Sequence, residues 1–412
     1  MIRRTFVLLT SSLALQACVG AAPPVAVRPV ASPAASTAAP AGRGVAILAP
    51  LTGPNAERGA ALVRAAQLAL AEPGSPKLDV RDTMGTPAGA AAAATAAIDA
   101  GAGLIIGPLT AGETAAAARP AQAAGVPVLA FTSDPAQAKP GVWTFGITPA
   151  QQVNRLVGAM AAQGKTRLAA LLPQNDFGNA MGAALAAAAA SASLPAPDIR
   201  SYSGAMSSMN AAARDLSGYA SRRGPLDAQI KAAREQHDAA GRQRVAELSR
   251  QNTGGAPFDA LLLAETGDNL ATLASLLPYY DISAPAVRVL GPALWASSTA
   301  RGGASLDGAF YAAPDPASRA DFDAKYTAIA GDAAPGLADL AYDAAAIARV
   351  LAKSDGFSAA SLCRTEGYAG VDGVLMLLPD GRVRRGLALF EIQRGGAVMV
   401  EPAPTGVSAP GI

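Results

Sequence analysis

The sequence predicts an α/β protein with two lobes, each built around a doubly wound parallel sheet. From residue 44 onward, short apolar runs alternate with segments of helical period, which is typical of strands buried between two layers of helices. The alternation restarts after residue 148, which indicates a second sheet. The chain of 412 residues is also longer than one core supports, since hydrophobic cores stop growing at about 250–300 residues.

The predicted elements follow one another in a regular order. In the first lobe, we predict strands at residues 44–48, 77–82, 103–107 and 126–131. In the second lobe, we predict strands at residues 167–173, 259–264 and 287–290. Residues 370–400 have the pattern of an antiparallel closing element with a turn at residues 379–382. Helical segments between the earlier strands make the sheets parallel, with right-handed crossovers.

The first residues have the pattern of an export signal. Arg3 and Arg4 precede an apolar stretch that is too short to span a bilayer. Residues 15–18, Leu-Gln-Ala-Cys, resemble the lipobox of bacterial lipoproteins, which implies cleavage before Cys18 and a lipid on Cys18. Val19 stands where that family carries an aspartate for inner-membrane retention, so the resemblance implies the periplasmic face of the outer membrane. The alternative is a plain secretory signal in which Cys18 is incidental.

The residues after Cys18 are mainly alanine, proline, serine and valine, a composition typical of an extended tether. We therefore expect a signal peptide at 1–17, a lipidated cysteine and tether at 18–43, lobe one at 44–147 and 311–370, lobe two at 148–310 and 371–401, and a flexible tail at 402–412.

Composition argues against several classes of site. The single histidine, His237, lies in a charged segment and not at a strand end, where a Ser-His-Asp site would need it. Two cysteines are too few for a zinc–thiolate or iron–sulfur cluster, and a net charge of +2 gives no reason to expect nucleic acid. No phosphate- or dinucleotide-binding glycine motif follows a predicted strand. We expect no enzyme activity, metal or cofactor, and an acid pair of Asp176 and Glu265 is the remaining enzymatic alternative.

Hydroxyl, glycine and acidic residues recur at the predicted strand ends of both lobes. In open α/β sheets, ligands bind beside these ends, near helix N-termini. Each serine or threonine there also has the simpler role of a helix N-cap, and a large apolar residue there has the simpler role of a core residue. The recurrence predicts a cleft for a small polar or anionic ligand, with these candidates: Thr52, Gly53, Thr110, Thr132, Ser133, Asp176, Phe177, Glu265, Thr266 and Trp295.

Residues 205–251 are far more charged than the rest of the chain, and we predict an exposed helical pair inserted into lobe two. Charged exposed helices steer association between proteins. The docking candidates are Arg222, Arg223, Lys231 and Arg234. The alternative is a solvated flap without a partner.

Five motifs in this order resemble the type 1 periplasmic-binding-protein fold, in its leucine/isoleucine/valine-binding branch. They are Val-Ala-Ile-Leu-Ala-Pro-Leu-Thr-Gly at 45–53, Gly-Pro-Leu at 107–109, Phe-Thr-Ser at 131–133, Asn-Asp-Phe-Gly at 175–178 and Ala-Tyr-Asp-Ala at 341–344. The resemblance implies two lobes joined by three crossovers, near residues 146–149, 310–314 and 367–371.

Within that fold, the lipobox, the tether, the charged insertion and the stretch Leu-Leu-Pro-Tyr-Tyr-Asp at 276–281 are similar to the LpoA-like lipoprotein activators of penicillin-binding proteins. The ending from residue 369 to residue 387 is similar as well. This resemblance implies a non-catalytic protein that docks on a class A penicillin-binding protein and activates peptidoglycan synthesis. The best-known activators also carry an N-terminal helical-repeat domain, in whose place this sequence has the tether.

The alternative is a solute-binding lipoprotein of an ABC transporter for branched-chain amino acids or a related small polar ligand. That branch implies that Thr132 and Ser133 would hold the α-carboxylate, and Phe177 keeps an aromatic ring in lobe two. No acid follows residues 291–292 to pair with an α-ammonium group. A buried ammonium group needs an anionic partner, so amino-acid binding is disfavoured unless Glu265 substitutes.

Overall fold

The computed structural model describes residues 44–251, 254–298, 303–354 and 356–406. The predicted signal peptide, Cys18, the whole tether and residues 407–412 of the predicted tail lie outside these residues. Within them, no helix is both long enough and apolar enough to cross a bilayer.

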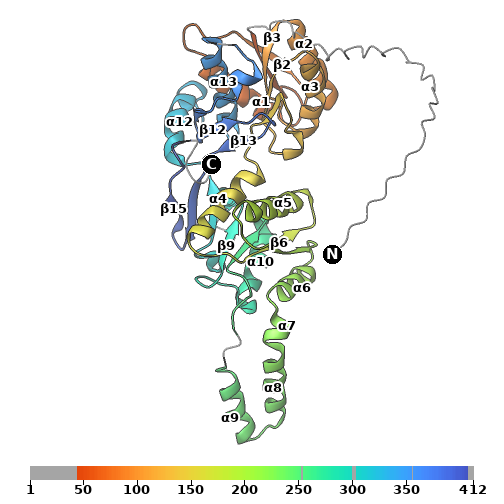
Figure 1. The fold of residues 1–412 in the computed structure, drawn as a ribbon, viewed down its shortest axis with the longest axis vertical. Helices are drawn as coiled ribbons and strands as arrows, with labels where there is room; N and C mark the ends of the chain where they lie inside the picture. The colour runs from red at the N-terminus through yellow and green to blue at the C-terminus, as the bar shows by residue number, and fades with distance from the viewer. Residues whose placement is uncertain (1–43, 252–253, 299–302, 355, 407–412) are drawn as a thin grey trace, which may run out of the picture. The chain divides into compact units, whose positions relative to one another are not determined.

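Lobe one contains a five-stranded sheet in the order β2-β1-β3-β4-β5, and every neighbouring pair in it is parallel. Its strands are β1 (Gly44–Ala49), β2 (Leu78–Asp82), β3 (Ala102–Ile106), β4 (Val128–Ala130) and β5 (Val142–Thr144). The helices between them are α1 (Ala56–Ala69), α2 (Pro87–Asp99) and α3 (Ala111–Ala123). The same lobe takes up α12 (Pro316–Ala330), α13 (Ala338–Ala352) and α14 (Ala359–Leu362), and α13 packs against α1 (Figure 1).

Lobe two contains a seven-stranded sheet in the order β15-β14-β10-β9-β8-β6-β7. Its parallel strands are β6 (Leu168–Pro173), β7 (Asp198–Tyr202), β8 (Ala260–Leu263), β9 (Arg288–Gly291) and β10 (Phe310–Ala313). Two antiparallel strands close it: β14 (Ala388–Gln393) and β15 (Gly396–Glu401). Its helices include α4 (Pro149–Ala162), α5 (Asp176–Ser191), α6 (Met206–Leu216), α10 (Gly267–Leu276) and α11 (Trp295–Ser298). The α/β class predicted from the sequence is confirmed.

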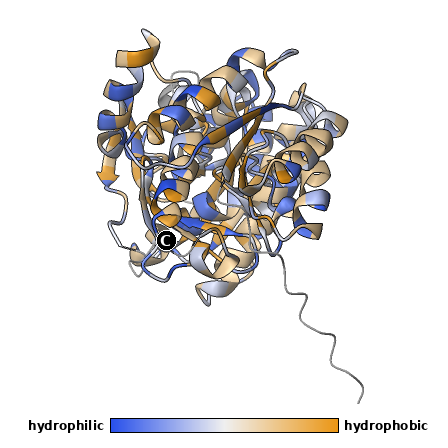
Figure 2. Cartoon of the chain, turned by 90° about the horizontal axis from the view of Figure 1, so that it is seen from above, coloured by the Kyte–Doolittle hydropathy of each residue, from blue (hydrophilic) through white to orange (hydrophobic). Residues whose placement is uncertain are grey.

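Each central strand is buried on both faces. In β1, Val45 and Ile47 belong to one hydrophobic cluster, whereas Ala46 and Leu48 belong to another on the opposite face of the sheet. This is why the strand is a continuous apolar run and not an alternating one. Figure 2 shows hydrophobic and hydrophilic residues along single helices, the pattern of helices with one buried face.

The chain passes between the lobes three times. The first passage follows β5 and the second follows β10, as the resemblance implies, but the third comes after residue 385 and not near residues 367–371. The reason is a small antiparallel sheet of β11 (Tyr368–Gly370), β12 (Gly373–Leu377) and β13 (Val383–Arg385).

This three-stranded sheet belongs to lobe one. Leu375, Leu377 and Val383 share one hydrophobic cluster with β1. The Trp143 indole in β5 donates a 2.7 Å hydrogen bond to the carbonyl of Leu378 in the β12–β13 turn. Residues 371–385, expected in lobe two, therefore lie with lobe one, and residues 311–313, expected in lobe one, lie in β10 of lobe two.

The charged insertion is shorter than residues 205–251. Helix α6 packs against β7 and α10 and is part of the lobe, so the inserted part is α7 (Tyr219–Arg222), α8 (Gly224–Glu235) and α9 (Ala239–Leu248). Helices α8 and α9 lie side by side (Figure 1) and have a small hydrophobic cluster of their own, formed by Leu226, Ile230, Ala233 and Leu248. We call residues 219–248 the helical insertion.

Candidate functional site

The strand-end residues of the β1 turn are engaged within lobe one. The Thr52 hydroxyl donates a 2.8 Å hydrogen bond to the carboxylate of Asp82, which also accepts the backbone N–H of Leu51. Partial burial opposes ionisation of Asp82, but hydrogen bonds from Met84, Thr52 and Leu51 hold its pKa below the ordinary value. Gly53 has a φ of +83° and lets the turn lead into α1.

Thr110 is a helix cap. Its side chain accepts a hydrogen bond from the Glu113 backbone N–H at 3.3 Å, and the Glu113 carboxylate accepts the Thr110 backbone N–H at 3.0 Å, which is a complete capping box for α3. The Thr132 hydroxyl is buried and accepts the backbone N–H of Asp134, while Ser133 is exposed. The simpler role that the sequence offered for these residues accounts for Thr110.

The lobe-two candidates start helices or lie in the core. Asp176 is exposed in the first turn of α5, and Phe177 is half-buried against a lobe-two hydrophobic cluster. Glu265 and Thr266 precede α10, where Thr266 makes no side-chain cap bond. Burial, with the neighbouring Glu265 charge, raises the pKa of Tyr202 above its ordinary value.

Trp295 is a core residue. Its side chain is fully buried, and its indole N–H donates a 2.8 Å hydrogen bond to the Glu265 backbone carbonyl. The ring lies so close to Gly291 that a Cβ at that position would meet ring atoms at 2.3 Å. An indole therefore stands after residues 291–292, where the branched-chain-binding branch carries an acid.

The ten cleft candidates do not form one described site. Among the described residues, no hydrogen bond or ion pair joins a lobe-one candidate to a lobe-two candidate, and none joins Asp176 to Glu265. None of the ten lines any of the five cavities characterised in this structure. Within the described residues, no group of three or more His, Cys, Asp or Glu side chains could hold a metal ion.

A buried network of charges, which no local sequence pattern indicates, lies beside the passages between the lobes. Arg385 is fully buried; it lies 3.5 Å from the carboxylate of Asp343 and donates to the Phe145 carbonyl at 3.3 Å. Arg319 lies 3.4 Å from Asp339 and 3.3 Å from Asp372. The network thus joins α12, α13 and β13 to the residue after β5, and Asp343 is the aspartate of the Ala-Tyr-Asp-Ala motif.

The network holds three buried carboxyl groups and two guanidinium groups, and Arg319 also pairs with the half-exposed Asp323 at 3.4 Å. Burial raises the pKa of Asp343 to about 6, against the opposing effect of Arg385. Burial and the neighbouring Asp339 raise the pKa of Asp372 well above its ordinary value, which favours its protonated form. Burial opposes ionisation of Asp339 as well, but the neighbouring Asp372 carboxyl and the charge of Arg319 hold its pKa below the ordinary value.

The docking candidates divide into two kinds. Arg222 is largely buried; it donates to the Ser217 carbonyl at 2.8 Å and pairs with Asp281 at 3.3 Å, so it anchors the base of the helical insertion. Arg223 pairs with Asp227 on the same helix. Only Lys231 and Arg234 are exposed and without an ion pair among the described residues.

Three tyrosines also meet at this base. The Tyr219 and Tyr279 rings stack with centroids 5.6 Å apart, and Tyr280 meets both edge-on. Tyr279 is 65% exposed. Residues 276–281 carry part of the resemblance to the LpoA-like activators, but no local sequence pattern indicates that these rings meet.

Comparison with known proteins gives one family. A family model described as periplasmic binding protein matches residues 44–397. No curated protein matches the chain.

Three solved structures of similar fold match this chain over nearly the whole of their own length. A putative branched-chain amino acid ABC transporter protein from Rhodospirillum rubrum is 20% identical, with a TM-score of 0.64, 87% of this chain and 99% of that chain covered. The C-domain of LpoA from Haemophilus influenzae, a regulator of PBP1A, is also 20% identical, with a TM-score of 0.60 and the same coverage. LivJ from Streptococcus pneumoniae, solved in complex with isoleucine, is 15% identical, with a TM-score of 0.51, 87% of this chain and 99% of that chain covered. At these identities the likeness shows the fold alone.

Proposed function

The chain belongs to the periplasmic binding protein family, and from this premise we propose that it is a non-catalytic periplasmic protein that activates a peptidoglycan synthase by direct contact. The synthase would be a class A penicillin-binding protein. The observation that carries the proposal is that four of the ten strand-end candidates are engaged inside their own lobes: Thr52, Thr110, Thr132 and Trp295.

The lobe-two side chains argue against an amino-acid ligand. An α-ammonium group taken out of water costs several kcal/mol unless an anion lies beside it. Trp295 fills the position after residues 291–292 with a buried indole, which carries no charge. Glu265, the substitute acid that the sequence left open, lies beside the buried Tyr202 hydroxyl.

Two features support contact with a protein. The helical insertion exposes Lys231 and Arg234 on α8, and its own hydrophobic cluster gives it a defined shape. The LpoA C-domain, which is described as a regulator of PBP1A, matches this chain over 99% of its own length. Exposed basic side chains on one protein raise the rate at which it encounters a partner with an acidic surface.

Reversing both exposed charges with Lys231→Glu and Arg234→Glu is expected to weaken binding to a class A penicillin-binding protein roughly threefold to tenfold, mainly through slower association. Surface plasmon resonance at two salt concentrations measures this. The matched control is Lys353→Glu with Arg119→Glu, two exposed residues in lobe one. If both double variants lose the same binding affinity, or if neither loses any, the helical insertion is not part of the interface.

The solute-binding alternative has its own test. Isothermal titration with isoleucine is expected to give no heat of binding, because the residue after positions 291–292 is the buried, uncharged Trp295 and not an acid that could pair with the ammonium group. Saturable heat with isoleucine, together with no association with any class A penicillin-binding protein of the same organism, would favour the transporter role.

We also propose that the protein is held to the outer membrane by a lipid on Cys18, a residue outside those the structure describes. Replacing Cys18 with alanine is expected to move the protein from the membrane fraction to the soluble periplasmic fraction. The acyl chains on Cys18 would be the attachment to the membrane, and the variant has no residue there to carry them. Fractionation and metabolic palmitate labelling measure this, with Cys363→Ala as the matched control. A membrane-bound Cys18 variant would refute the anchor.

A further inference from the structure

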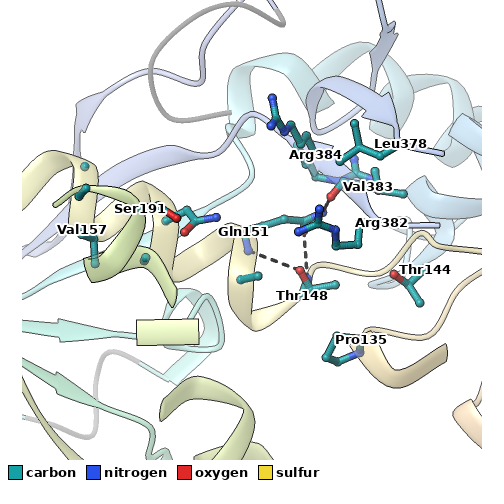
Figure 3. A pocket seen from close by; sticks show the side chains of 16 residues that line it. Pro135, Thr144, Thr148, Gln151, Val157, Ser191, Leu378, Arg382, Val383 and Arg384 are labelled. Carbon is teal, nitrogen blue, oxygen red and sulfur yellow. Dashed lines mark hydrogen bonds between the residues drawn. The ribbon is translucent and has the colours of Figure 1, made fainter. Parts of the chain in front are cut away.

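A cavity of ≈ 440 Å³ lies beside the passages between the lobes, apart from all ten cleft candidates. Its walls come from the start of α4, the end of α5 and the β12–β13 turn with β13 (Figure 3). Small-molecule sites typically have volumes of about 300–1,000 Å³, so the cavity is large enough for an organic ligand.

The charged side chains that line this cavity are all basic. They are Arg382, Arg384 and Arg385, and no carboxylate lines it. Arg382 and Arg384 are two residues apart in extended chain, so their side chains lie on one face, and both are exposed, whereas Val383 and Arg385 are buried on the other face.

The three guanidinium groups differ in how far they are neutralised. Arg382 donates to the Asp380 carboxylate at 2.7 Å, and Arg385 pairs with Asp343. Arg384 has no ion pair and no side-chain hydrogen bond within the described part of the chain. The Nε of Arg385 is buried there without a hydrogen-bond partner. The cavity therefore keeps the unpaired positive charge of Arg384.

The remaining walls suit the body of an organic anion. Asn154, Thr144 and Ser191 supply uncharged hydrogen-bonding groups, and Val157 and Leu378 supply apolar surface. The 14-residue helix α4 begins at this wall, and the positive end of its dipole favours an anion nearby.

We propose that this cavity binds a small organic oxyanion, a carboxylate or phosphate carried on a polar body, with Arg384 as its main charged contact. A guanidinium group binds either oxyanion through two parallel N–H bonds. Gln151 of α4 already donates to the Val383 carbonyl of β13, so a ligand held between Arg384 and Asn154 would contact both lobes where they meet.

The test is isothermal titration of the full chain with three probes: N-acetylmuramyl-L-alanyl-D-glutamate, its diamide and glycerol 3-phosphate. We expect one of the two oxyanions to bind and the diamide not to bind. The tighter oxyanion identifies whether the group is a carboxylate or a phosphate. Arg384→Ala is expected to weaken that binding about 10-fold to 100-fold, the loss for one charged hydrogen-bonding partner.

Arg119→Ala, which removes an exposed arginine on α3, is the matched control and is expected to leave the affinity unchanged. Because Arg384 is exposed, its replacement should also leave the thermal unfolding temperature unchanged. The proposal is overturned if neither oxyanion binds, if acid and diamide bind equally, or if the two alanine variants behave alike.

Discussion

Replacing Arg385 with alanine is expected to lower the free energy of unfolding by about 3–5 kcal/mol, the cost of removing one partner from a buried ion pair. The side chain is fully buried, and its loss leaves Asp343 without its nearest cation and the Phe145 carbonyl without a donor. Because these contacts join β13 to α13 and to the residue after β5, the loss falls where the chain passes between the lobes.

Urea unfolding monitored by circular dichroism measures this effect. Arg382→Ala is the matched control, because Arg382 pairs with Asp380 three residues from the same site but is exposed. That exposed pair is expected to contribute no more than about 1 kcal/mol. If the two variants lose the same free energy of unfolding, the buried network stabilises the protein no more than an exposed ion pair does.

A companion variant checks which carboxyl holds the proton. Asp372→Asn replaces a protonated acid with an amide that still donates a hydrogen bond, so it is expected to cost much less than Arg385→Ala at neutral pH. The raised pKa of Asp372 and the lowered pKa of Asp339 predict this asymmetry. An Asp372→Asn variant as unstable as Arg385→Ala would mean that Asp372 is ionised in the folded protein.

Replacing Trp295 with alanine is expected to lower the free energy of unfolding by about 3–5 kcal/mol, the usual cost of emptying a large buried aromatic site. The indole is fully buried against Gly291 and donates to the Glu265 carbonyl, so alanine leaves a cavity and an unsatisfied acceptor in lobe two.

Trp295→Phe separates the two contributions. It keeps an aromatic ring and removes the indole N–H, so it is expected to cost less, about 1–3 kcal/mol. Thermal unfolding of the two variants measures the difference. A Trp295→Ala protein as stable as the parent would mean that the indole is not part of the core and that the position is open to a ligand.

The sequence predicted the fold well because burial leaves a direct trace in it. The run at 44–48 is apolar on both faces of β1, and such continuous runs between helical segments therefore indicated the sheet. The sequence also offered the cap role of Thr110, because a threonine three residues before a glutamate at a helix start is a local pattern.

The parts that the sequence did not predict depend on contacts between distant residues. Nothing near Arg222 in the sequence shows that Asp281 neutralises it, so the sequence alone presents this anchoring arginine as a docking candidate. The expected lobe boundary at residue 370 followed the resemblance, whereas the pairing of Trp143 with Leu378 keeps the next strands in lobe one. The Arg385 network joins residues from four separate segments, and no window of sequence contains it.

The triple passage of the chain has a consequence for its synthesis. The hydrophobic interior of lobe one draws on residues from Val45 to Val383, and that of lobe two on residues from Ala169 to Ile392. Neither interior can be completed while the ribosome still holds the last strands. The two halves must therefore mature together, after translation of nearly the whole polypeptide, and a truncated product would leave both with exposed apolar surface.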